Sequence, residues 1–222
     1  MFKIDKSKWK RRETYNNFIK YTNPVFSVGT RLDITELLKY CEEKQKRFFP
    51  TFLYFVTQCL NEIEELRTRI TGDDVVVFER INPSYIVMLE NEELVTCVSQ
   101  AKEDFAEFYT ETEKNIDTVR KNNTAYFNKE TCLDCVYISC LPWTDFTSVI
   151  NPYNFNDKSG TSIPRITWGK YSENAKGRME IAIDVSAHHA LIDGRQISRF
   201  YEKMQETLSE PEGFLGGRKD ER

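Results

Sequence analysis

The stretch Met179–Phe200, MEIAIDVSAHHALIDGRQISRF, holds the only two histidines of the 222-residue chain, His188 and His189. Apolar and polar residues alternate over residues 179–186, which predicts a strand with one buried face. If this register continues, His189 lies on the apolar side and His188 on the polar side. An Asp-Gly pair and apolar residues at helical spacing follow, so we expect the histidines at a strand-to-helix junction.

Burial of the His189 imidazole would favour its neutral form, and a neutral imidazole can accept a proton. His189 is therefore the candidate general base of an enzyme. The alternative is that His189 is only a hydrogen-bonded core residue and His188 a surface residue. A metal site at the pair is disfavoured, because adjacent strand residues point to opposite faces and the chain has no third histidine.

The composition fits one folded domain and argues against several classes of function. Hydrophobic residues make up 40% and aromatic residues 13% of the chain, which suffices for a sizeable core. A formal charge of -4 with interspersed signs disfavours nucleic-acid binding. No signal peptide or membrane span is evident, so we expect a cytoplasmic protein without membrane contact. We predict a single domain over residues 1–210 and a polar, mobile tail over residues 211–222.

The six cysteines are expected to be reduced and mostly buried, as is usual for a cytoplasmic protein. Cys132 and Cys135 form a C-x-x-C pair, which in other contexts binds zinc or undergoes redox chemistry. The chain has no second such pair, and this one lacks the strand-to-helix context of redox motifs. No metal site is therefore predicted.

Hydrophobic periodicity predicts further strands and helices outside the histidine stretch. One helix begins at Asp33, where Glu36 would complete a capping box, and a second has Pro50 in its first turn. Three short strands then form an antiparallel meander, and an amphipathic helix is followed by a polar connector. Besides these two helices, the expected elements are strand 26–32, strands 75–80, 84–89 and 94–99, helix 102–121, connector 121–130 and strand 134–141.

The motif HHALIDG, with Arg-Phe five residues later, resembles the H-H-x-x-x-D-G signature of chloramphenicol acetyltransferases. ISCLPWTDFTS, from Ile138, is similar to the I-S-A-x-P-W segment of that family, and ITWGKY, from Ile166, to its I-T-M-x-K-Y strand. The resemblance runs in order from Trp9 to Leu208. Dihydrolipoyl acyltransferases carry a looser form of the histidine motif, but no lipoyl domain or linker is expected before this fold.

The resemblance implies roles for five residues around the reaction. His189 would be the general base, and Ser139 would donate a hydrogen bond to the oxyanion of the tetrahedral intermediate. Thr167 would help to hold a water molecule near the reacting centre. Arg11 would pair with Asp193 and so keep the histidine loop in position.

Two further groups of residues follow from the resemblance. Coenzyme A would bind along Arg47, Phe49, Lys170 and Tyr171, because its phosphates need cations. The acceptor pocket would contain Phe18, Val95, Val149 and Asn151, where drug-acetylating members have tyrosine, two phenylalanines and leucine. Smaller and more polar residues lose apolar contact at about 25 cal/mol per Å². The chemistry is therefore expected to be retained, while the identity of the acceptor stays open.

The expected fold is an α/β two-layer sandwich, with a mixed sheet covered by helices. The expected activity is direct transfer of the acetyl group of acetyl-CoA to a hydroxyl of chloramphenicol or a similar small molecule, without an acyl-enzyme. The resemblance also implies a homotrimer with active sites at subunit interfaces, and a link to antibiotic resistance. The alternatives are the same chemistry on another alcohol or amine, and a non-catalytic trimeric relative.

Overall fold

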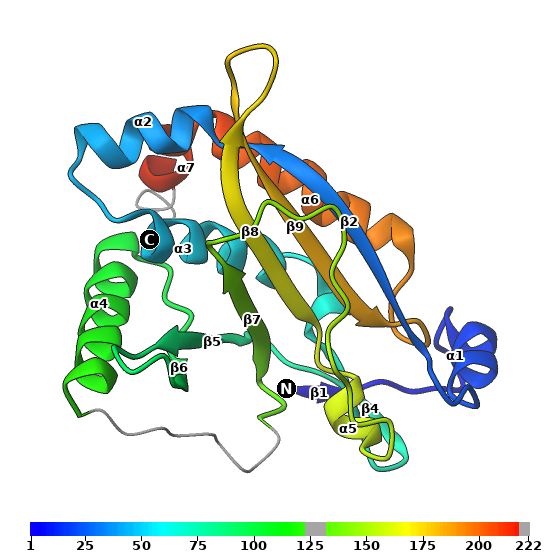
Figure 1. Ribbon diagram of the computed structural model, residues 1–222. Coiled ribbons are helices and arrows are strands. Elements are labelled where there is room, and N and C mark those ends of the chain that lie inside the picture. The colour runs from blue at the N-terminus through cyan, green and yellow to red at the C-terminus, as the bar shows by residue number, and fades with distance from the viewer. Residues whose placement is uncertain (123–131, 218–222) are drawn as a thin grey trace.

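A six-stranded mixed sheet runs through the molecule in the order β2-β9-β8-β7-β5-β6 (Figure 1). The computed structural model describes residues 1–122 and 132–217. The β5–β7 and β7–β8 pairs are parallel, and the other neighbouring pairs are antiparallel. In chain order the strands are β2 (Val25–Asp33), β5 (Asn82–Met88), β6 (Leu94–Val98), β7 (Cys135–Leu141), β8 (Arg165–Glu173) and β9 (Met179–His188).

A small antiparallel sheet lies beside the large one, in the order β1-β4-β3. Its strands are β1 (Phe2–Lys3), β3 (Thr68–Thr71) and β4 (Asp74–Val77). The predicted meander of three strands is therefore wrong for its first member, which joins this second sheet as β4. The β5–β6 pair is antiparallel as predicted. Alternation of side chains predicts a strand but not the partner with which it pairs.

The helices pack mainly on one face of the large sheet, and α3 lies at the centre of the core (Figure 1). Every residue of α3 from Pro50 to Leu60 is buried, because α6 and α4 cover the sides of the helix that do not face the sheet. No helix in residues 1–122 and 132–217 is long and apolar enough to cross a membrane. The helices are α1 (Arg12–Phe18), α2 (Thr35–Glu43), α3 (Phe48–Asn61), η1 (Glu64–Arg67), α4 (Phe105–Asn122), α5 (Lys158–Thr161), α6 (Gly194–Ser209) and α7 (Pro211–Gly217).

The start of α2 differs from the prediction. Its N-cap residue is Ile34, and the capping box predicted from Asp33 and Glu36 is wrong. Both carboxylates bind Arg178, at 2.6 Å from Asp33 and 3.1 Å from Glu36. Asp33 Oδ1 still accepts a hydrogen bond from Thr35 N–H at the start of the helix, at 2.9 Å, whereas Glu36 binds a guanidinium from a hairpin distant in sequence.

The C-terminal segment contains a helix that the sequence analysis does not predict. A mobile tail is predicted from residue 211, but Pro211–Gly217 form α7. The ring of Phe214 lies 4.9 Å from that of Phe55, between ring centroids, so apolar contact with α3 stabilises the segment. Residues 218–222 and residues 123–131, which include most of the predicted connector, lie outside the described residues.

The segment between β7 and α5, residues 142–157, runs along the sheet face opposite α6 (Figure 1). Asn151 Nδ2 donates to Ser186 Oγ at 3.2 Å, and the Tyr153 hydroxyl donates to the Ser186 carbonyl at 3.3 Å. Asp184 and Ser186 on β9 are therefore buried beneath this segment. The prediction that only one face of this strand is buried is wrong, because the covering segment comes from elsewhere in the chain.

Candidate active site

The two histidines occupy different environments at the end of β9. The strand ends at His188, whose carbonyl accepts a hydrogen bond from Leu191 N–H, so the chain turns and His189 leaves the strand register. His188 is 3% exposed, whereas the side chain of His189 is 32% exposed. The predicted assignment of burial is therefore wrong: His188 is the core histidine. Its burial lowers the pKa to about 4, and its Nδ1 accepts a hydrogen bond from Ala190 N–H.

The ring of His189 is held by contacts on one nitrogen and on its faces. Nδ1 lies 3.2 Å from the Ile192 carbonyl oxygen and 3.1 Å from Asp193 Oδ1. Neither oxygen has a proton to donate, so the neutral imidazole carries its proton on Nδ1 and Nε2 has a free lone pair. The ring stacks on Phe18 at 4.0 Å and lies 4.4 Å from the ring of Phe26. In this tautomer Nε2 can accept a proton, as the atom of a general base must.

Arg11 and Asp193 support the loop that carries His189. The Arg11 guanidinium donates to both oxygens of Asp193, at 2.5 and 2.6 Å, and to the carbonyls of His189 and Ala190, at 2.7 and 2.8 Å. The hydrogen bond from Arg11 lowers the pKa of Asp193, so the carboxylate is charged at neutral pH. Asp193 N–H donates to Gln196 Oε1, which fixes the start of α6.

Ser139 and Thr167 lie side by side on β7 and β8, where they are paired in register. Their neighbours Ile138 and Trp168 are buried in the helix-covered core, so strand alternation turns Ser139 and Thr167 to the opposite face. Thr167 Oγ1 donates to Asn151 Oδ1 at 3.3 Å. The two hydroxyls therefore lie on the face that the 142–157 segment crosses.

Within one chain, His189 and Ser139 do not meet. Thr167 pairs with Ser139 on one side and with Asp184 on the other, and His189 follows Asp184 by five residues. With about 3.3 Å per residue along a strand and about 4.8 Å between strands, the two α-carbons are roughly 19 Å apart. A serine and a histidine side chain together cannot span that distance. A site that uses both residues thus requires two copies of the chain.

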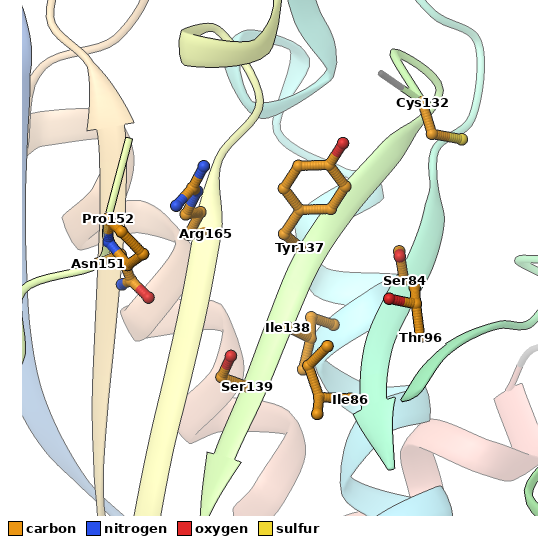
Figure 2. Close-up of a pocket in the computed structure, with 10 residues that line it drawn as sticks. All are labelled: Ser84, Ile86, Thr96, Cys132, Tyr137, Ile138, Ser139, Asn151, Pro152 and Arg165. Atoms are coloured by element: carbon orange, nitrogen blue, oxygen red, sulfur yellow. The ribbon is translucent and has the colours of Figure 1, made fainter. Parts of the chain in front are cut away.

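A pocket of about 330 Å³ opens on this face of the sheet (Figure 2). Strand alternation could have indicated two of its residues, because Arg165 and Tyr137 share a face with Thr167 and Ser139. None of the described residues that line it is acidic. The lining consists of Ser84, Ile86, Thr96, Cys132, Tyr137, Ile138, Ser139, Asn151, Pro152 and Arg165.

The four residues expected in the acceptor pocket are scattered. Asn151 lines the pocket, Phe18 lies against His189, and Val149 is half-buried without lining the pocket. Val95 does not line this pocket, because its side chain is fully buried in the core on the helix side of β6. Thr96, on the other face of β6, lines it. Neighbouring residues of a strand point to opposite faces of the sheet.

Residues expected to bind coenzyme A gather where β8 ends near the start of α3. Lys170 and Tyr171 are exposed, and the ring of Tyr171 lies 5.3 Å from that of Phe48. Arg47, which precedes Phe48, is also exposed, and its Nε lies 2.7 Å from Glu113 Oε1. Cationic and aromatic side chains are thus together at one end of the sheet. Sequence reasoning missed Phe48, whose ring, rather than that of Phe49, contacts Tyr171.

Phe49 points toward the core from the same end of α3. Its ring centroid lies 5.6 Å from that of Tyr85 and 5.7 Å from that of Trp168. The side chain is only half-buried.

The C-x-x-C pair forms a tight cluster with an acidic residue. Sγ of Cys132 lies 2.6 Å from Sγ of Cys135 and 3.0 Å from Asp134 Oδ1. Burial raises the pKa of both thiols, which opposes formation of the thiolates that a metal ion needs. Structural zinc takes four ligands, and this group of described residues offers three.

Comparison with known proteins shows to which class of enzyme and to which family this chain belongs. The sequence profile described as chloramphenicol acetyltransferase matches residues 1–205. A protein named chloramphenicol acetyltransferase from Proteus mirabilis is 31% identical over 210 residues, which cover 93% of this chain and 94% of that protein. One of the same name from Campylobacter coli is 30% identical over 211 residues, covering 93% and 98%. The molecule is thus an acetyl-CoA-dependent acetyltransferase. It belongs to the chloramphenicol acetyltransferase family.

Solved structures agree with this assignment and confirm the predicted fold class. A chloramphenicol acetyltransferase aligns with a TM-score of 0.85 at 29% identity, over 93% of this chain and 100% of that chain. The cubic core of the pyruvate dehydrogenase multienzyme complex aligns with a TM-score of 0.66 at 16% identity, over 91% and 87%. The second likeness shows a shared fold alone.

Proposed function

We propose that this protein transfers the acetyl group of acetyl-CoA directly to a hydroxyl of chloramphenicol or a similar small molecule. His189 Nε2 takes the proton of the acceptor hydroxyl as its oxygen attacks the thioester carbonyl. A new ester bond forms, the bond from carbon to sulfur breaks, and the proton passes to the departing coenzyme A thiolate. No acyl-enzyme is needed, because the acceptor itself is the nucleophile.

The observation that carries this proposal is the position of His189 Nδ1 between two oxygen acceptors. A ring free to rotate or to exchange its proton between the two nitrogens would offer Nε2 only part of the time. Phe18 against one face of the ring restricts rotation further. The Arg11–Asp193 pair keeps the loop, and so the imidazole, aligned.

We propose further that the site forms between subunits of a homotrimer, where His189 of one subunit meets Ser139 of the next. The separation of roughly 19 Å within one chain supports this arrangement. So do two exposed apolar side chains on the 142–157 segment, Trp143 at 63% and Ile150 at 93% exposure. Ser139 would donate to the oxyanion, and Thr167 would hold a water molecule beside it.

Acetyl-CoA would enter at the end of β8, where its phosphates would meet the side chains of Lys170 and Arg47. The rings of Tyr171 and Phe49 would contact its apolar parts. The thioester would then lie next to Ser139.

The direct test is transfer from acetyl-CoA to chloramphenicol by the purified protein. The reaction is followed by loss of thioester absorbance and by mass spectrometry of the ester, because the six free cysteines would react with a thiol reagent. We expect acetylated chloramphenicol and no change in the protein's intact mass when the acceptor is omitted. A stable acetylated protein would contradict direct transfer. Absence of any ester with chloramphenicol and with simple alcohols would contradict the activity.

The assembly is tested separately by sedimentation, where we expect a trimer. Mixing an inactive His189→Ala protein with an inactive Ser139→Ala protein, after dissociation and reassembly, should restore part of the activity, because some interfaces then contain both intact residues. Failure to restore activity in mixed trimers would contradict a shared site.

A further inference from the structure

Arg165, in the wall of the pocket, is a cation that has no carboxylate partner among the described residues. It lies at the start of β8, and its Nε is buried without a hydrogen-bond partner in the structure. Within residues 1–122 and 132–217, no ion pair or side-chain hydrogen bond to this guanidinium is found. The Arg165 side chain is half-buried, and its buried Nε loses hydration that no acceptor among the described residues replaces. A bound anion would supply the missing acceptor.

Two aromatic rings hold the guanidinium in place. The guanidinium carbon lies 3.8 Å from the ring centroid of Tyr153 and 5.8 Å from that of Tyr137. Contact with ring faces occupies the flat sides of the guanidinium and leaves the N–H donors at its edge available. Figure 2 shows Arg165 beside Tyr137, with Ser139 further along β7 in the same pocket. The two rings thus hold the guanidinium at the pocket wall without supplying a negative charge.

We propose that Arg165 binds a carboxylate on the acceptor, so that the preferred substrate is an anionic alcohol rather than a neutral one. This inference rests on the proposed acetyl transfer and specifies its substrate class. A carboxylate accepts two N–H bonds from one guanidinium, a pairing both stronger and more directional than that with a neutral oxygen. The lining offers hydroxyl and amide groups and, among the described residues, no acidic group, which suits such a substrate.

The position of Arg165 favours the acceptor over a phosphate of coenzyme A. Arg165 pairs with Tyr137, and Ser139 lies two residues further along β7, in the direction of Lys170. The proposed oxyanion donor thus lies between Arg165 and the coenzyme residues. Two strand residues span about 7 Å, which sets the distance between the acceptor hydroxyl and its carboxylate.

A matched pair of acceptors tests the inference. 4-(Hydroxymethyl)benzoate has a hydroxyl and a carboxylate at about the required separation, and 4-(hydroxymethyl)benzamide differs only in charge. We expect kcat/KM to be roughly 10- to 100-fold higher for the benzoate with the native protein, as one charge-assisted pair provides. Chloramphenicol serves as a second neutral acceptor. The native comparison requires no variant to fold.

Variants then assign the preference to one residue. Arg165→Met should bring the benzoate-to-benzamide ratio close to one, and Arg165→Lys should keep part of it. Arg199→Met is the matched control, because it removes the same charge from an exposed position on α6 and should keep the native ratio. Binding of the benzoate by calorimetry gives a readout that does not depend on turnover.

The outcomes separate the two proposals. Transfer to alcohols without a carboxylate preference overturns the role of Arg165 and leaves the activity standing. Another outcome is that the native protein binds the benzoate, that Arg165→Met abolishes this binding, and that no acetyl transfer occurs. This outcome supports the anion site and overturns the activity. Equal losses for benzoate and benzamide in Arg165→Met would make the residue structural and would also overturn the inference.

Discussion

Arg11 and Asp193, 182 positions apart in sequence, form a two-point ion pair with N–O distances of 2.5 and 2.6 Å beside the imidazole of His189. The same guanidinium also binds the backbone carbonyls of His189 and Ala190. One side chain from the N-terminal segment thus fixes both the carboxylate and the backbone of the histidine loop. The geometry of the candidate base consequently depends on the two ends of the chain being folded together.

Arg11→Val and Asp193→Asn should each lower the unfolding temperature and the turnover. Removal of one partner leaves the other without its counter-charge, and a lysine cannot donate to both carboxylate oxygens in the fixed geometry of the arginine guanidinium. We expect a coupling energy above about 0.5 kcal/mol in a double-mutant cycle measured by urea unfolding, because unconnected sites add within about 0.3–0.5 kcal/mol. Additive effects would exclude a coupled pair.

His189→Ala should lower turnover by at least about 10²–10⁴, the usual contribution of a general base, without loss of the fold. His188→Ala should instead lower the free energy of unfolding, because His188 is buried and its ring fills core space. Steady-state kinetics and thermal unfolding of both variants distinguish the roles. Loss of activity only in His188→Ala would reverse the assignment.

Ser139→Ala should reduce kcat by roughly 10²–10³ with little change in KM, because an oxyanion donor acts mainly in the transition state. The change removes one hydroxyl from the pocket face, so the fold should be retained. Steady-state kinetics against acetyl-CoA gives both constants. A raised KM with unchanged kcat would assign Ser139 to coenzyme binding instead.

The unfolding free energy should fall between pH 6.5 and 4, because burial lowers the pKa of His188 from 6.5 to about 4. In this range the unfolded chain binds a proton that the folded chain does not, so acid favours unfolding. The contribution of His188 to the unfolding free energy is fully present above pH 6.5, and about 2 kcal/mol of this contribution should be lost at pH 5. Asp193, whose pKa is lowered from 3.8, acts only at more acidic pH.

The matched variant for this pH dependence is His188→Gln, which has no ionisable group. Urea unfolding at pH 7 and pH 5 should show a smaller difference for this variant than for the native protein. Identical differences would mean that other groups cause the acid sensitivity.

Val95→Ala and Thr96→Leu, at neighbouring residues of β6, should distinguish a core position from a pocket position. Val95→Ala creates a core cavity and should lower the unfolding free energy by about 1–3 kcal/mol with little change in acceptor KM. Thr96→Leu should change acceptor KM, because Thr96 lines the pocket. A changed acceptor KM in Val95→Ala alone would place Val95, and not Thr96, in the acceptor pocket.

Much of this protein could be predicted from local signals in the sequence. The alternation before His188, the Asp193-Gly194 turn and the helical spacing after it predicted β9 and α6, because these elements depend on nearby residues. The resemblance carried by HHALIDG and the two further motifs predicted the fold class, which the structural comparison confirms. It also named Arg11, which the structure brings to Asp193.

Burial and partners were decided only by the tertiary structure. Alternation along β9 distinguished two faces, but the distant 142–157 segment determined that both are covered. The turn after β9 decided that His188, and not His189, is the core histidine, while the separation of His189 from Ser139 depends on strand order. Whether a carboxylate reaches Arg165 depends on the placement of side chains from distant segments, and none does so within residues 1–122 and 132–217. Such properties arise from contacts between residues far apart in sequence, so no local pattern contains them.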